Sequence, residues 1–159
     1  MLRRALLVTV LMGAAASLSF SEPLDVVLSI NPIAKLGAVF TTDSSVLIGN
    51  PTDPAALITA GLVTTLYGVP AAFLLWNLAT HNPPNVKVWR TISFGTDLGV
   101  TLTVLGVGSY TLVSDILNPP GGEDWAGLVG ALLILLAIPM GLGTLADTVP
   151  FPMEAGGKP

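Results

Sequence analysis

The chain has 159 residues, of which 52% are hydrophobic and only 10% are charged. A soluble domain carries about 25% charged residues, so this composition excludes a water-solvated surface and indicates a bilayer as the solvent. The net charge is -4 and the six Lys and Arg residues form no basic patch, which argues against nucleic acid as a partner. With no cysteine and a single histidine, His81, the sequence predicts neither a metal site nor a cofactor.

The first apolar run covers residues 5–20 and follows Arg3 and Arg4. It is slightly short for a span of about 20 residues. Its basic start and small-residue end are also typical of a secretory signal peptide. We interpret it as a first transmembrane helix, with cleavage as the alternative.

Residues 21–54 are mixed in character. Prolines and charged residues divide them into two apolar patches, 26–30 and 33–40, and neither patch is long enough to cross a bilayer. We therefore predict an extramembranous loop, with at most a short interfacial helix at the second patch. The charged residues in this segment are Glu22, Asp25, Lys35, Asp43 and Asp53.

Three longer apolar runs follow. The second predicted span covers about residues 55–79 and contains Pro70, which is expected to kink it because proline removes a backbone hydrogen bond. The third span covers about residues 88–117 and the fourth about 125–145, each long enough for a hydrocarbon core of about 30 Å. The tail, residues 148–159, is rich in Pro and Gly and is predicted to be irregular.

These runs predict an all-α fold, a transmembrane helical bundle of four helices, or of three if the N-terminal segment is cleaved. The bundle forms a single domain over residues 1–147. The positive-inside rule places both termini and the linker 80–89 in the cytosol, and residues 21–54 and 118–124 outside or in the lumen. The expected location is a secretory-pathway or plasma membrane, with the lipid bilayer as the main partner.

Asp97 is the candidate residue for chemistry. It follows Arg90 by seven residues, about 10 Å along a helix axis, which places it in or near hydrocarbon. A carboxylate there is costly and normally faces the bundle interior, so Asp97 is a candidate catalytic acid or base. The alternative is a shallow position where Thr101 or Arg90 caps the carboxylate. No second intramembrane acid or base is apparent that would complete a proton relay.

Other polar and small residues have simpler interpretations. Asp115 and Asp147, near the ends of their spans, and His81, in a linker, are expected to contact water. Small residues spaced by four, as in 95–99 and 126–130, predict close packing of helices within the membrane. The Ser and Thr hydroxyls in the spans are expected to bond mainly to carbonyls of their own helix.

Three short motifs stand out in the predicted spans, namely Val88-Trp89-Arg90, the pair Gly95 and Asp97, and Asp124-Trp125. They resemble those of a family of small uncharacterised fungal membrane proteins with four predicted helices. The resemblance covers about residues 55–145 and implies a four-helix fold, but it implies little about activity. Members of that family place a histidine shortly after the aspartate that matches Asp97, whereas Val100 stands here, so no shared acid-base role is implied.

The sequence favours a small multi-pass membrane protein of structural or accessory-subunit type, with other membrane protein subunits as candidate partners. The sparse intramembrane polarity and the absence of catalytic motifs support this interpretation. The alternative is a lipid-modifying or lipid-binding membrane enzyme of the sterol-isomerase-like kind, which uses Asp97 in an intramembrane cavity.

Overall fold

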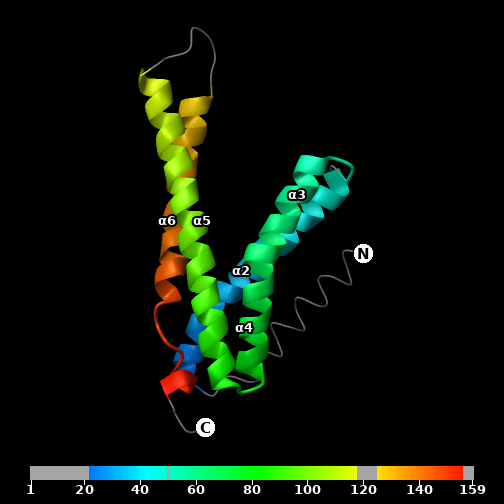
Figure 1. Cartoon of the computed structure of the whole chain (residues 1–159), viewed down its shortest axis with the longest axis vertical. Helices are drawn as coiled ribbons and strands as arrows, with labels where there is room; N and C mark the ends of the chain where they lie inside the picture. The colour runs from blue at the N-terminus through cyan, green and yellow to red at the C-terminus, as the bar shows by residue number, and fades with distance from the viewer. Residues whose placement is uncertain (1–21, 50, 118–124, 156–159) are drawn as a thin grey trace. The chain divides into compact units, whose positions relative to one another are not determined.

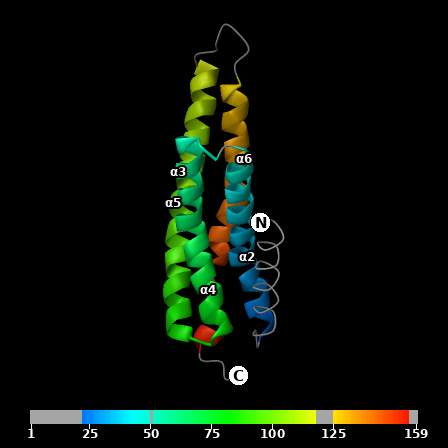
Figure 2. The same cartoon turned by 90° about the vertical axis from the view of Figure 1, so that its right-hand side faces the viewer.

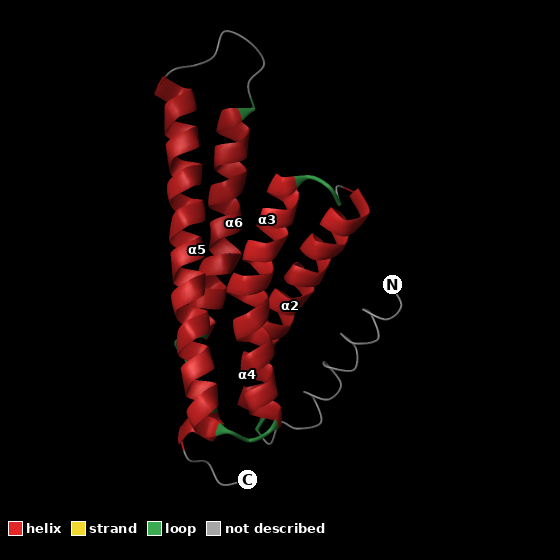
Figure 3. Ribbon diagram, turned by 45° about the vertical axis from the view of Figure 1, so that its right-hand side comes forward, coloured by secondary structure: helices red, strands yellow, loops and turns green. Residues whose placement is uncertain are grey.

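A computed structural model of the chain describes residues 22–49, 51–117 and 125–155. The secondary-structure elements formed by these residues are all helices, and the described residues contain no strand (Figure 3). The predicted all-α helical-bundle fold is therefore confirmed. The predicted span at residues 5–20 lies outside the described residues. Among the described residues, four helical stretches are long and apolar enough to cross a membrane, namely Pro23–Gly49, Pro54–Ala79, Pro83–Leu117 and Ala126–Ala146.

The segment predicted as an extramembranous loop is instead a 27-residue helix, α2 (Pro23–Gly49). Proline suits the first turn of a helix, where its missing N–H would have no partner anyway, whereas Pro32 lies in the interior and removes one backbone hydrogen bond. The prediction was wrong because it took the charged residues as signs of exposure to water. Several of them lie on the buried face, which has helical spacing and consists of Asp25, Leu28, Ser29, Pro32, Lys35 and Val39.

The second candidate span consists of α3 (Pro54–Val63), the π-helical segment η1 (Thr64–Gly68) and α4 (Val69–Ala79). Asp53 caps its start, because the Asp53 side chain accepts a hydrogen bond of 3.0 Å from the backbone N–H of Ala55. Pro70 stands just after η1, so the irregularity that proline predicts is found here as a π-helical turn. The span runs alongside α2 (Figure 1 and Figure 2).

A tight turn joins α4 to α5 (Pro83–Leu117). The N–H of Asn82 donates to the carbonyl of Asn77 at 2.9 Å, and the N–H of His81 donates to that of Leu78 at 3.2 Å. These two bonds are those of a Schellman motif, in which the residue after the helix cap adopts a left-handed conformation. His81 occupies that position with a φ of 52°.

The chain divides into two compact units, one made of residues 94–146 and the other of the residues before and after them. In the unit 94–146, most of α5 packs against α6 (Ala126–Ala146), and glycines allow their close approach. A Cβ added at Gly130 would lie 2.6 Å from the backbone nitrogen of Leu112. The predicted small-residue spacing therefore has a packing role at Gly130, whereas Gly95 and Gly99 are exposed and a Cβ there would meet nothing within 4 Å.

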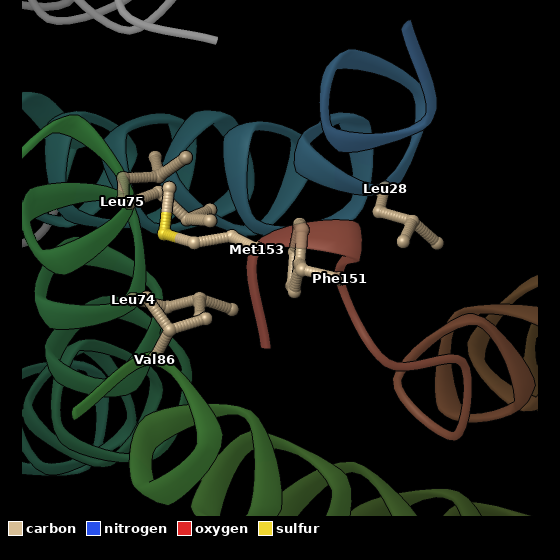
Figure 4. Close-up of a cluster of buried hydrophobic side chains, with 7 residues drawn as sticks. Leu28, Leu74, Leu75, Val86, Phe151 and Met153 are labelled. Atoms are coloured by element: carbon tan, nitrogen blue, oxygen red, sulfur yellow. The ribbon is translucent and has the colours of Figure 1, made fainter. Parts of the chain in front are cut away.

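The other unit has its apolar core where α2, α4 and the start of α5 meet the C-terminal tail (Figure 4). The tail, predicted as irregular, forms the short 3-10 helix η2 (Pro152–Ala155) after Asp147. Phe151 and Met153 of the tail are buried, which fixes the tail to the helices. The core residues are Leu28, Leu74, Leu75, Leu78, Val86, Phe151 and Met153.

Candidate functional site

Polar and apolar side chains are distributed in the reverse of a soluble protein. Large apolar residues face outward, such as Ile30 at 61% exposure and Leu132 at 55%, while charged groups are buried. This is the arrangement expected when lipid surrounds the helices, because intramembrane polar groups then face the protein interior. The buried polar residues are Asp25, Ser29, Lys35, Asn77, Ser93, Asp97, Thr144 and Asp147.

Lys35 forms the centre of a buried polar network. It is the thirteenth residue of α2, about 18 Å along the axis from Pro23, and its side chain is 7% exposed. Its ammonium lies 3.0 Å from Oδ2 of Asp147 and also donates to the hydroxyl of Ser93. The Nδ2 of Asn31 donates to the second carboxylate oxygen of Asp147 at 2.9 Å. Both oxygens of Asp147 therefore accept a hydrogen bond from α2.

Arg90 extends this network to the tail. Its Nε and Nη2 donate to the two carboxylate oxygens of Glu154, each at 2.9 Å, in a bidentate arrangement. Its Nη1 donates to the backbone carbonyl of Asp147 at 2.9 Å. Bidentate pairs are strong and geometrically specific, so Arg90 holds the tail at two points against α5. We call the set of Asn31, Lys35, Arg90, Ser93, Asp147 and Glu154 the ionic network.

Asp25 lies beside the ionic network and differs from it. Its side chain is fully buried, and its one hydrogen-bonding neighbour among the described residues is the backbone of Met153. Glu22, Glu154 and His81 are close enough to interact with Asp25 electrostatically. A buried polar group normally has hydrogen-bond partners. The burial of Asp25, like that of the ionic network, is therefore not explained by apolar packing alone.

Asp97, the residue predicted for chemistry, is buried on α5 at 3% exposure. The predicted capping groups have other contacts: the hydrogen bonds of Arg90 go to Glu154 and Asp147, and the hydroxyl of Thr101 lies 3.4 Å from that of Thr144. Burial agrees with the expectation for an intramembrane carboxylate. Its catalytic role stays a prediction.

The other sequence predictions have mixed outcomes. Asp147 was expected to contact water, but it is 5% exposed and paired with Lys35, so that prediction was wrong. Asp115 is half-buried and packs beside Gly127, where a Cβ would lie 2.1 Å from its carboxylate. His81 is exposed in its turn, as predicted.

Threonine hydroxyls bond largely as predicted. The hydroxyl of Thr103 donates to the carbonyl of Gly99 at 2.8 Å, and that of Thr91 donates to Lys87 at 2.9 Å. Thr64 is an exception, because its hydroxyl crosses to α2 and donates to Asp43 at 2.9 Å. This contact stands beside a groove of about 220 Å³ between α2 and α3.

The sequence analysis missed Lys35, Asp25 and Asp43 because it placed them in a loop. One signal was available, since Asp25, Ser29, Pro32 and Lys35 follow one another at intervals of three or four residues, as on one helix face. The partner of Lys35, however, is 112 residues away in the chain. No local pattern predicts that contact.

Within residues 22–49, 51–117 and 125–155, no three His, Asp or Glu side chains are placed to hold a metal ion. Comparison of the chain with protein-family models, with curated proteins and with solved structures found no match. The resemblance to fungal four-helix membrane proteins therefore stays a prediction.

Proposed function

We propose that the chain is a small multi-pass membrane protein of structural or accessory-subunit type. The ionic network is the observation that supports this proposal. Its charged groups are paired with one another, from α2 to α5 and the tail, and so they serve to hold the fold. The long apolar faces of the helices remain outward, available to lipid and to other membrane subunits.

The test is purification of the tagged full-length chain from its own membrane in a mild detergent. We expect it to elute in a complex larger than its 16.3 kDa mass, with at least one membrane protein present in stoichiometric amount. An unrelated tagged protein with four spans, expressed at the same level, is the control for non-specific capture. Elution of the chain alone in several mild detergents, with no enriched partner, would contradict the proposal.

The proposed orientation follows from the distribution of basic residues. Residues 50–53 and 118–125 contain no Lys or Arg and carry three acidic residues. Lys87 and Arg90 lie near the start of α5, at the opposite ends of the helices, and Lys158 follows in the sequence of the tail. The positive-inside rule then places the turn at residues 80–82 and the tail in the cytosol, with the membrane belonging to the secretory pathway or to the plasma membrane.

Burial of Asp97 favours a second candidate, a lipid-modifying or lipid-binding enzyme of the sterol-isomerase-like kind. An intramembrane carboxylate is a functional candidate by default. Its test is Asp97→Asn, which removes the acid-base group with little change of shape. If membrane lipid composition changes while the protein level does not, the enzyme is supported. An unchanged lipid composition at the same protein level would exclude it.

A further inference from the structure

A groove lies between the C-terminal half of α2 and the start of the second candidate span. It has a volume of about 220 Å³ and is open on one side. Most of its lining is apolar, with a single carboxylate and a single hydroxyl. The lining residues are Asp43, Val46, Leu47, Leu57, Ala60, Gly61 and Thr64. None of them belongs to the ionic network or is near Asp97 in sequence.

Only one of the two carboxylate oxygens of Asp43 has a hydrogen-bond partner among the described residues. Its Oδ2 accepts a hydrogen bond of 2.9 Å from the hydroxyl of Thr64, while its Oδ1 is buried and has no hydrogen-bond partner among the described residues. A buried acceptor without a donor costs about 1–3 kcal/mol, so a ligand that supplies the donor gains that energy. Thr64 opens the π-helical segment η1, and such segments are frequent at functional sites.

The depth of the groove limits what can occupy it. Asp43 precedes Gly49, the last residue of α2, by six residues, or about 9 Å along the axis. This level is just below the end of a candidate span, where the polar end of a membrane lipid meets its apolar body. The occupant must therefore donate one hydrogen bond and be apolar elsewhere.

The charge of Asp43 and the volume of the groove limit which lipid head group can bind there. A phosphate head group would be repelled by the carboxylate of Asp43, and the volume is below the 300–1,000 Å³ of most ligand pockets. A small head group without a phosphate fits, with the rest of the molecule lying along the outside of α3 in the bilayer. We propose that this groove binds a membrane lipid whose head is a single hydroxyl group, and that this hydroxyl donates to Asp43.

The test is photo-crosslinking of the purified full-length protein in lipid nanodiscs. The probes are a photoreactive sterol and a photoreactive diacylglycerol, each with its hydroxyl free, and the methyl ether of each. We expect at least one free-hydroxyl probe to label peptides from residues 43–64 at least fivefold more than its ether. The two probes also show which lipid body the groove prefers. If both hydroxyl probes label no more strongly than their ethers, or if neither hydroxyl probe labels the protein, the proposal is overturned.

Two variants address the site itself. Asp43→Leu removes the acceptor, and Gly61→Leu fills the groove without a backbone clash, because a Cβ at Gly61 would meet nothing within 4 Å. Both should reduce labelling by the hydroxyl probe at least fivefold. Gly99→Leu is the matched control, since a Cβ at Gly99 also meets nothing within 4 Å and the residue is outside the groove. Labelling of monodisperse Gly61→Leu at the wild-type level would overturn the proposal even if Asp43→Leu fails to fold.

Discussion

The pair of Lys35 and Asp147 places two charges in a buried setting, so each depends on the other. Removing one partner of a buried pair leaves an uncompensated charge and costs roughly 3–5 kcal/mol. We expect Asp147→Leu to destabilise the fold by about that amount, because the buried ammonium of Lys35 then loses its ion-pair partner. The measurement is thermal or SDS-induced unfolding of the purified protein in a mild detergent.

A double variant separates charge from packing. Lys35→Met with Asp147→Leu replaces both charges by apolar groups, so it should be more stable than Asp147→Leu alone. Lys87→Met is the control for losing a lysine at an exposed position of α5, with an expected change within about 0.5 kcal/mol. If Asp147→Leu is as stable as the control, the pair does not hold the fold together.

His81 is the one described residue other than glycine with a positive φ, 52°, and this is a site of backbone strain. Glycine adopts the left-handed region without the steric penalty that a Cβ brings, and it is the usual residue at this position of a Schellman motif. We expect His81→Gly to raise the free energy of unfolding by up to about 1 kcal/mol. A decrease in thermal stability would show instead that the imidazole has a necessary contact, for example with the nearby charge of Asp25.

Single residues also show what a sequence can and cannot predict. Burial of Asp97 followed from one local fact, a carboxylate well inside an apolar run. Burial of Asp147 could not be predicted from such a local fact. Asp147 follows the last residue of the fourth apolar run, and this position is equally typical of a residue that contacts water. Only the ammonium of Lys35, 112 residues earlier in the chain, and the tail that folds over it distinguish the two cases.

Among the elements, α2 was the one that the sequence analysis misjudged. The later spans have long uninterrupted apolar runs, so hydropathy located them at nearly their observed bounds. In α2 the mean hydropathy is lowered by polar residues that lie on its buried face, where other parts of the chain satisfy them. Hydropathy summed along a segment does not distinguish such a face from a solvated one. A helical plot of the polar positions shows that several of them share one face, but only the partners elsewhere in the chain show that this face is buried.

The packing of α5 against α6 gives a prediction for this pair of helices. A Cβ at Gly130 would meet the backbone nitrogen of Leu112 and the hydroxyl of Thr111, both at 2.6 Å. Backbone cannot move aside locally, so Gly130→Ala should separate the helices and lower stability by about 1–3 kcal/mol. Gly106→Ala on the exposed face of α5 meets nothing within 4 Å and should be neutral or slightly stabilising. Equal unfolding temperatures for the two variants would argue against close glycine packing.

At the scale of the whole molecule, the helical α2 changes the predicted topology. If all four candidate spans cross the membrane, residue 22, the turn at 80–82 and the tail lie on one side, and residues 51–53 lie on the other. Residue 22 therefore changes sides relative to the sequence prediction. Arg3 and Arg4 can join Lys87 on the cytosolic side only if residues 5–20 do not cross. Under the proposed orientation, whether residues 5–20 cross the membrane therefore depends on whether α2 crosses it.

The absence of cysteine makes this topology directly testable, because any introduced thiol is the only one in the chain. We expect Thr52→Cys, in the exposed linker before α3, to react with a membrane-impermeant maleimide in intact cells or sealed vesicles of known orientation. Thr80→Cys and Ala155→Cys, at the other end of the helices and also exposed, should react only after permeabilisation. Reaction of Thr52→Cys and Thr80→Cys from the same side would show that Pro54–Ala79 does not cross the membrane. Opposite reaction with the sides exchanged would keep the four crossings but reverse the orientation, so that the ionic network and the tail would face away from the cytosol.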